Sequence, residues 1–216
     1  MHLYKFKSDT SLNHIEDIIK SNKFYLSSFD QLNDPMEGYF SYSMNEISIR
    51  ELDIFKKNKQ DLRVCSLAYN YHNYLMWSHY ANMHKGLCFE VEINKNDKTL
   101  LKVNYSKQVP KLKKTNGQFN IPPEKVLSSK FINWRYENEY RFVSQESNKD
   151  IGRIKSIIFG IKSLITFRDK IFSICRENNR KIKFYRAKMG FNNNKIIREP
   201  INVYNNIDNI TAIYRM

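Results

Sequence analysis

The sequence predicts an α+β fold, a single compact domain over residues 1–216 in which helices pack around short, mainly antiparallel strands. Segments with apolar residues at helix spacing alternate along the chain with short segments rich in β-branched and aromatic residues. No internal repeat and no Gly-, Pro- or Ser-rich linker divides the chain. A chain of 216 residues is also long enough to bury one sizeable core.

The first half of the chain alternates strongly between the two periodicities. The predicted strands are 2–6, 23–29, 62–69 and 87–93, and the predicted helices are 8–22, 44–58 and 73–86. Helix 8–22 is indicated by apolar residues at helix spacing, Leu12, Ile15, Ile18 and Ile19. Asp9 or Thr10 is its expected N-cap, and Gly86 is expected to end helix 73–86.

The second half continues the pattern. Pro122 and Pro123 are expected to start helix 122–132. The remaining predicted elements are strands 139–143, 154–160 and 181–187, and helix 163–178, which places Leu164, Phe167, Ile171 and Ile174 on one face. The last segment, 192–216, has two pieces rich in Ile and Tyr, which form a terminal strand or dock on a partner.

Positive charge is the strongest signal in the composition. The formal net charge is +14, and most of the excess lies beyond residue 100, in the runs 102–114 and 176–190. Lysine and arginine interleaved with tyrosine and phenylalanine suit phosphate contact and base stacking, so nucleic acid or an acidic protein is the expected partner. The alternative is that these basic residues form solvent-exposed faces that bind no partner, in a host whose proteins are generally basic. The residues expected to contact nucleic acid or phosphate are Lys111, Lys113, Lys114, Arg135 and Arg141.

Several classes of protein are excluded. No stretch of about 18 apolar residues predicts a membrane span, and the amino terminus has no apolar signal-peptide core, so a cytoplasmic protein is expected. The three cysteines are odd in number and far apart, which argues against a disulfide framework and a structural zinc site. We expect no metal, and no glycine-rich phosphate loop, nucleophile elbow or zinc-protease motif is present.

Four pieces of the chain resemble the bacterial DUF2971 family, whose members have no assigned function. They are 3–6, 24–38, 76–91 and 134–143, the last followed by 157–160. The order of the pieces also resembles the ADP-ribosyltransferase fold. Such enzymes carry a His or Arg on a first strand, an aromatic or Ser-rich second strand and a late strand opened by a catalytic glutamate, often as Glu-x-Glu. Here Glu137 and Glu139 stand in that last position.

This resemblance implies cleavage of the nicotinamide–ribose bond of NAD, whose transition state carries positive charge on the ribose. Glu139 would stabilise that charge, and Glu137, two residues earlier on the same strand face, would activate the acceptor. Arg141 shares this face and either holds the pair ionised or binds phosphate. The alternative is a surface ladder of charges on an antiparallel strand, each pair contributing about 0.2–1 kcal/mol.

The resemblance also implies a set of NAD-binding residues. The His or Arg of the first strand is replaced here by Tyr4, Lys5 and Phe6, so it is open which residue takes its role. The expected NAD-binding residues are Tyr4, Lys5, Tyr25, Ser27, Ser28, Trp77, His79 and Tyr80. For His79 a structural role is the alternative, and the segment 33–35 is expected first of all to form a turn.

The function expected from these features is ADP-ribosyl transfer from NAD to RNA, DNA or a cellular protein. Because such an activity is toxic to its host, a toxin–antitoxin or phage-defence system and an inhibitory partner such as an antitoxin are expected. Two alternatives stay open. One is a non-catalytic nucleic-acid-binding module in which the glutamates are structural, and the other is a ribonuclease that uses His79 and Glu139 as its acid–base pair.

Overall fold

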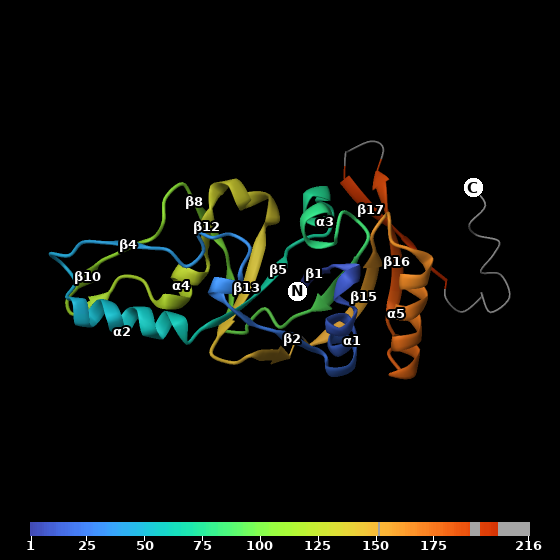
Figure 1. The fold of residues 1–216 in the computed structure, drawn as a ribbon, viewed down its shortest axis with the longest axis horizontal. Helices are drawn as coiled ribbons and strands as arrows, with labels where there is room; N and C mark the ends of the chain where they lie inside the picture. The colour runs from blue at the N-terminus through green and yellow to red at the C-terminus, as the bar shows by residue number, and fades with distance from the viewer. Residues whose placement is uncertain (151, 191–194, 203–216) are drawn as a thin grey trace. The chain divides into compact units, whose positions relative to one another are not determined.

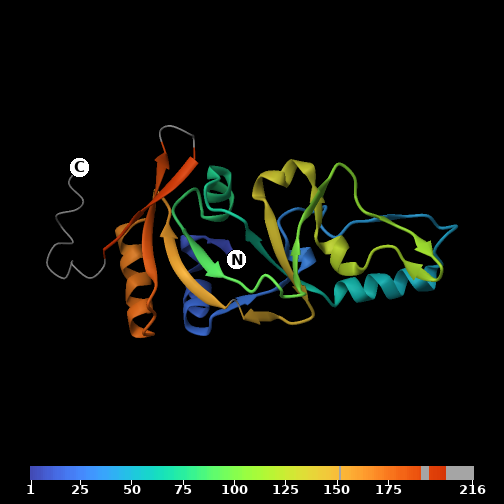
Figure 2. The ribbon, with the colours of Figure 1, turned by 180° about the vertical axis from the view of Figure 1, so that it is seen from behind.

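The computed structural model describes residues 1–150, 152–190 and 195–202 (Figures 1 and 2). Its contacts group the chain into two compact units. Unit 1 comprises Met1, Lys23–Tyr69 and Asn94–Asp150, and unit 2 comprises His2–Asn22, Asn70–Ile93 and the described part of Ile151–Met216. Each unit is α+β, with a mainly antiparallel sheet and helices, which confirms the predicted fold class. The single-domain organisation over residues 1–216 stays a prediction.

The sheet of unit 2 has the strand order β17-β16-β15-β6-β1. These strands are β1 (His2–Lys7), β6 (Leu87–Glu92), β15 (Arg153–Phe159), β16 (Lys183–Gly190) and β17 (Lys195–Pro200). Neighbouring strands are antiparallel except β15 and β16, which are parallel and are joined through α5 (Ile165–Glu177). A parallel pair needs such a crossover connection. The predicted terminal strand is confirmed in β17, and the second Ile/Tyr-rich piece lies outside the described residues.

Helices cover both faces of this sheet. On one face, Phe172 of α5 packs edge-on against Phe159 and Phe184 of the two parallel strands. Helix α1 (Leu12–Ser21) contacts α5 and buries Ile15, Ile18 and Ile19, as the helix spacing predicts. A short 3-10 helix, η1 (Asp9–Ser11), precedes α1, and its N-cap is Ser8 instead of the predicted Asp9 or Thr10. Leu164 is the N-cap position of α5 and is 64% exposed, so it does not join the buried face of that helix.

Helix α3 (Tyr74–Tyr80) lies on the opposite face, where Trp77 meets Phe6 of β1 edge-on. It ends well before Gly86, because the next turn leaves the helical region at residues with positive φ, namely Asn82, Met83 and His84. Gly86 is needed for close approach: a Cβ there would lie 2.0 Å from the carbonyl oxygen of Lys7. The predicted helical end at this glycine is therefore wrong.

The sheet of unit 1 has the order β3-β5-β13-β7. Its strands are β3 (Ser27–Ser28), β5 (Arg63–Ala68), β7 (Leu100–Lys102) and β13 (Glu139–Ser144). Short pairs accompany it: β2 (Lys23–Tyr25) with β14 (Asn148–Asp150), β4 (Ser41–Tyr42) with β9 (Lys111–Leu112), β8 (Asn104–Ser106) with β12 (Ser129–Phe131), and β10 (Lys114–Thr115) with β11 (Gln118–Phe119). The single-residue link at Leu26 splits the predicted strand 23–29 into β2 and β3.

The helices of unit 1 are α2 (Ile49–Gln60) and α4 (Pro123–Leu127), with the 3-10 helices η2 (Phe29–Gln31) and η3 (Ile132–Glu137). Ser48 and Glu51 form a capping box that fixes the start of α2. The core beside α2 consists of Ile47, Leu52, Phe55, Leu112 and Val126. Helix α4 ends five residues before the predicted limit, because the chain enters β12 at Ser129.

No helix in the described ranges is long and apolar enough to cross a membrane. Cys65, Cys88 and Cys175 are free and buried.

Candidate functional site

The Glu-x-Glu segment lies where a 3-10 helix meets a strand of unit 1. Glu137 is the last residue of η3, Asn138 has a left-handed conformation with φ of 44°, and Glu139 is the first residue of β13. The expectation that both glutamates lie on one strand face is therefore wrong for Glu137, because the turn at Asn138 separates it from the strand. Glu139 and Arg141 do share a face of β13.

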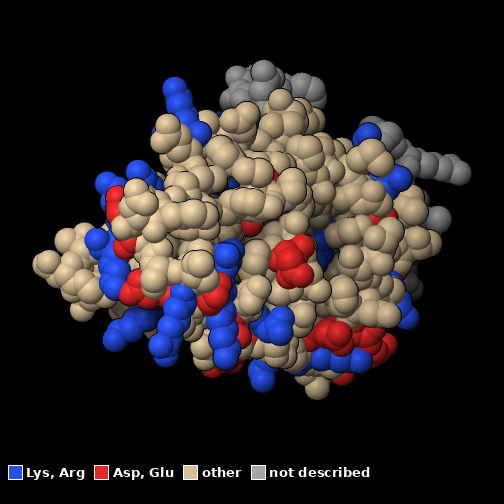
Figure 3. All heavy atoms as spheres, turned by 60° about the vertical axis from the view of Figure 1, so that its left-hand side comes forward, with Lys and Arg blue, Asp and Glu red and all other residues tan. Residues whose placement is uncertain are grey.

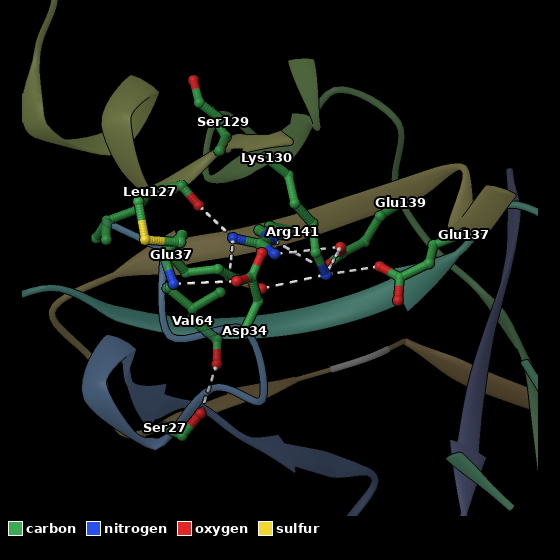
Figure 4. Close-up of polar contacts among 12 residues, drawn as sticks. Ser27, Asp34, Glu37, Val64, Leu127, Ser129, Lys130, Glu137, Glu139 and Arg141 are labelled. Carbon is green, nitrogen blue, oxygen red and sulfur yellow. Dashed lines mark hydrogen bonds and ion pairs between the residues drawn. The ribbon is translucent and has the colours of Figure 1, made fainter. Parts of the chain in front are cut away.

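Both glutamates belong to a buried ion-pair network (Figure 4). Lys130 of β12 places its Nζ 2.6 Å from Glu137 Oε2, 3.1 Å from Glu37 Oε1 and 3.4 Å from Glu139 Oε2. Arg141 donates from Nε to Glu139 Oε1 at 2.8 Å and from Nη2 to Oε2 at 3.1 Å. Its Nη1 lies 2.6 Å from Glu37 Oε2 and donates to the carbonyl oxygen of Leu127 at 2.7 Å. Glu37 lies in the turn at residues 35–38, here called the turn before α2. The network thus joins this turn to β12, η3 and β13.

The network holds Glu139 and Lys130 in the charged state. Burial acts to raise the pKa of Glu139, but the charges of Arg141 and Lys130 and the hydrogen bonds to Arg141 lower it to about 2. The pKa of Lys130 is raised by Glu139, Glu37 and Glu137 in spite of its burial. Three carboxylates face two cations, so the network has one surplus negative charge when each side chain is counted at its formal charge.

The network is closed to solvent. Glu137 and Glu139 are each 3% exposed, and Arg141 is 1% exposed. The ring of Trp134 lies over Lys130 Nζ, with the centroid at 4.7 Å, and the backbone N–H of Glu139 donates to the hydroxyl of Tyr105 at 2.9 Å. Both carboxylates and the guanidinium of Arg141, for which the sequence predicts a phosphate contact, therefore lie below the surface. The arrangement is that of a charged network inside the protein, not of an exposed ladder.

The NAD-binding residues predicted in unit 1 lie away from Glu139. Ser27 pairs with Val64 of β5, whereas Glu139 pairs with Ala68. Four residues along a strand span about 13 Å. Ser27 and Ser28 therefore lie towards the other end of this sheet, and Ser27 Oγ donates to the Val64 carbonyl oxygen at 3.4 Å. Tyr25, on β2, is 60% exposed.

The NAD-binding residues predicted in unit 2 have mixed environments. Trp77 is fully buried and donates from Nε1 to the Tyr71 carbonyl oxygen at 2.7 Å, so it is a core residue. His79 is exposed, and its ring contacts that of Tyr80. Lys5 is half-buried on β1. Tyr4 donates to a carboxylate that the sequence did not single out, Glu90.

The lysines and arginine predicted to bind phosphate in unit 1 also fall into two groups, exposed residues and one residue held in an ion pair. Lys111, Lys113 and Arg135 are exposed. Lys114 forms a close ion pair with Glu51, the N3 residue of α2, and the carboxylate neutralises the charge of the lysine.

A second polar cluster surrounds Glu90, on β6, which lies between β15 and β1 in the unit 2 sheet. Glu90 is 6% exposed and lies opposite Tyr4 on one side and Ser156 on the other. Its Oε1 accepts from the Tyr4 hydroxyl at 3.1 Å and lies 3.3 Å from His2 Nδ1. Its Oε2 accepts from Ser156 Oγ at 2.5 Å and from Arg198 Nη1 at 2.8 Å. Burial acts to raise the pKa of Glu90, but Ser156 and Arg198 lower it, so the carboxylate stays ionised.

One signal in the sequence indicates this cluster. The segment Leu87–Glu92 has apolar residues on both faces up to Val91, which is typical of a strand buried on both sides. An acidic residue inside such a strand needs hydrogen-bond donors or a cation. The sequence alone does not identify them, because Arg198 follows 108 residues later.

No family model, no curated protein and no solved structure matches the chain. Within the described residues, no group of three or more His, Cys, Asp and Glu side chains is arranged to hold a metal ion.

Proposed function

We propose that the protein binds nucleic acid, and that the contact surface for the phosphate backbone lies on the carboxyl-terminal elements of unit 2. The observation that carries the proposal is the excess of exposed cations on α5, β15, β16, β17 and the loops between them. The exposed cations are Arg153, Lys162, Lys170, Arg176, Lys181, Lys183, Lys188 and Lys195. The acidic residues of the same part, between residues 152 and 202, are Asp169, Glu177 and Glu199. Lys188 is paired with Glu199, and the other exposed cations leave this part of the chain with an excess of positive charge, which attracts a polyanion.

On the side of unit 1 where α2 lies, positive and negative side chains are mixed. Figure 3 brings forward the left-hand side of Figure 1, where α2 lies, and shows Lys and Arg with Asp and Glu among them. On α2 itself, Glu51 neutralises Lys114. Mixed charges of this kind give a weaker and less directional field than a basic surface. This difference is why the proposal favours unit 2 over the basic run at 102–114.

The buried glutamates are consistent with a binding protein. Each carboxylate of the unit 1 network lies within 3.4 Å of a cation and away from solvent. Such a network fixes the relative positions of β12, β13 and the turn before α2, which is a structural role.

Binding of fluorescent single-stranded RNA, single-stranded DNA and duplex DNA, followed by anisotropy, tests the proposal. The double charge reversal Lys181→Glu/Lys183→Glu is expected to weaken binding at least tenfold. The matched variant Lys111→Glu/Lys113→Glu reverses two exposed lysines of unit 1 and is expected to have a much smaller effect. Equal losses in the two variants, or no binding by the wild type, would contradict the proposal.

A second candidate function is ADP-ribosyl transfer from NAD, with Glu139 as the catalytic carboxylate on an ADP-ribosyltransferase-like fold. The observation that favours it is the surplus negative charge around an ionised Glu139, which suits a cationic ribose. The proposal includes RNA, DNA or a protein as the acceptor, a toxin role in the cytoplasm and an inhibitory partner. It requires that η3 and Trp134 move, because both glutamates are covered in this structure.

Labelled NAD incubated with RNA, DNA or cell lysate tests this second candidate. Transfer by the wild type, lost in Glu139→Gln and retained in Glu37→Gln, would support it, because Glu37 belongs to the same network but not to Glu-x-Glu. Equal loss in both folded variants would assign Glu139 a structural role. No transfer and no release of nicotinamide by the wild type would refute the candidate.

A further inference from the structure

We propose that Arg198 is a phosphate-binding residue, held ready by Glu90 and by two tyrosine rings. The site would take a phosphate group, either from a nucleic-acid backbone or as a free phosphate. The nucleic-acid source rests on the proposed function, whereas the phosphate site itself does not.

The Arg198 guanidinium is held in a fixed place. Its Nη1 donates to Glu90 Oε2 at 2.8 Å. Its central carbon lies 4.5 Å from the ring centroid of Tyr185 and 5.2 Å from that of Tyr71. Tyr71 is buried and Tyr185 is half-buried, so both rings limit the motion of the guanidinium. An arginine fixed in this way loses little conformational entropy when it binds a ligand.

Glu90 orients Arg198 and does not itself bind a ligand. Both of its oxygens already accept hydrogen bonds from inside the protein, Oε1 from Tyr4 and Oε2 from Ser156 and Arg198. It is 6% exposed, whereas the Arg198 side chain is 27% exposed. The carboxylate is therefore buried more deeply than the arginine side chain, which is partly open to solvent.

The unused part of the guanidinium is the part that binds oxyanions best. Nε and Nη2 lie on one edge and donate in parallel to two oxygens of one acceptor. In unit 1 the same edge of Arg141 binds both oxygens of Glu139. For Arg198, this edge has no hydrogen-bond partner among residues 1–150, 152–190 and 195–202. A phosphate has two oxygens at the spacing that this edge requires.

Two neighbours favour a phosphate ester of a nucleotide. The ring of Tyr185 is half-buried and leaves part of its surface to solvent, and such a ring stacks on a base. The imidazole of His2 is 45% exposed and places Nδ1 3.3 Å from Glu90 Oε1. This arrangement leaves its other nitrogen for a second contact to the ligand.

The test uses the full chain with Arg side chains labelled at Nε. Inorganic phosphate is titrated while the Nε–Hε signals are followed by NMR, and a short single-stranded RNA is titrated by anisotropy. Arg198→Lys keeps the charge and removes the two-donor edge, and Arg50→Lys, at an exposed arginine of α2 outside the proposed surface, is the matched control. We expect the Arg198 signal to shift with phosphate. We expect Arg198→Lys to weaken RNA binding about tenfold and Arg50→Lys to change it less than twofold.

The outcomes separate the two proposals. A shifted Arg198 signal without RNA binding by the wild type would leave the phosphate site standing with free phosphate as its source, and would refute the proposed function. RNA binding that is equally strong in both variants, with an unshifted Arg198 signal, would overturn the phosphate site and leave the proposed function standing. If Arg198→Lys does not fold, as judged by circular dichroism, the phosphate titration of the wild type decides.

Discussion

Replacing Lys130 with methionine tests whether the buried network of unit 1 is structural. The change keeps the length of the side chain and removes the one cation that lies within 3.4 Å of three carboxylates, Glu37, Glu137 and Glu139. Removing one partner of a buried ion pair leaves an uncompensated charge and costs about 3–5 kcal/mol. Loss of the cation–π contact with Trp134, at 4.7 Å, adds about 1 kcal/mol. We therefore expect the free energy of unfolding to fall by about 4–6 kcal/mol.

Urea unfolding at pH 8 and pH 5, followed by circular dichroism, measures this effect. The loss is expected to be smaller at pH 5, because carboxylates without Lys130 gain protons more readily. Adding Glu137→Gln to Lys130→Met is expected to recover part of the loss, since it removes one of the uncompensated charges. Lys125→Met, at an exposed lysine of α4, is the control. A loss below about 1 kcal/mol, as for an exposed ion pair, would refute the structural role.

Further predictions concern local features. Because the pKa of Glu139 is lowered from 4.5 to about 2, its contribution to stability is full above pH 4.5 and is lost as the pH falls towards 2; acid unfolding that is unchanged in Glu139→Gln would contradict this. Gly86→Ala is expected to cost more than about 4 kcal/mol, because its Cβ would lie 2.0 Å from a backbone oxygen. Gly117→Ala, whose Cβ meets nothing within 4 Å, is expected to cost only about 1 kcal/mol for its positive φ, as thermal unfolding would show. Ser48→Ala removes the capping box of α2 and is expected to cost about 1 kcal/mol, measured in the same way.

The sequence predicts most elements because their apolar spacing is local information. Helix α1 buries the three isoleucines that its spacing predicts, β6 lies within the expected range, and β15 begins and ends one residue before the predicted limits. Helix ends are predicted less well. The end of α3 depends on the left-handed residues Asn82, Met83 and His84. Asn82 is of a type that can end a helix in this way, but the sequence pattern predicts the end at Gly86. The close approach of Gly86 to Lys7 is a tertiary contact and is not visible in the local pattern.

For the candidate sites, too, the sequence predicts what depends on local information and misses what depends on tertiary contacts. The sequence singles out Glu137 and Glu139 and allows for a cation beside them, which is Arg141. It does not identify Lys130 or Glu37, because their pairing depends on how β12 and the turn before α2 pack on β13. Glu90 and Arg198 meet only through the order of strands in the unit 2 sheet. A single turn at Asn138 then decides that Glu137 does not follow the two-residue period of a strand.

The salt dependence of RNA binding tests the central claim most directly. The affinity of a single-stranded RNA is measured from about 50 to 300 mM KCl, and the slope of log K against log salt counts the phosphates that the protein neutralises, about 0.7 per contact. We predict a steep slope for the wild type and a slope reduced by about one contact per lysine in Lys181→Glu/Lys183→Glu. Binding that is independent of salt, or a slope that these two changes leave unaltered, would contradict the account.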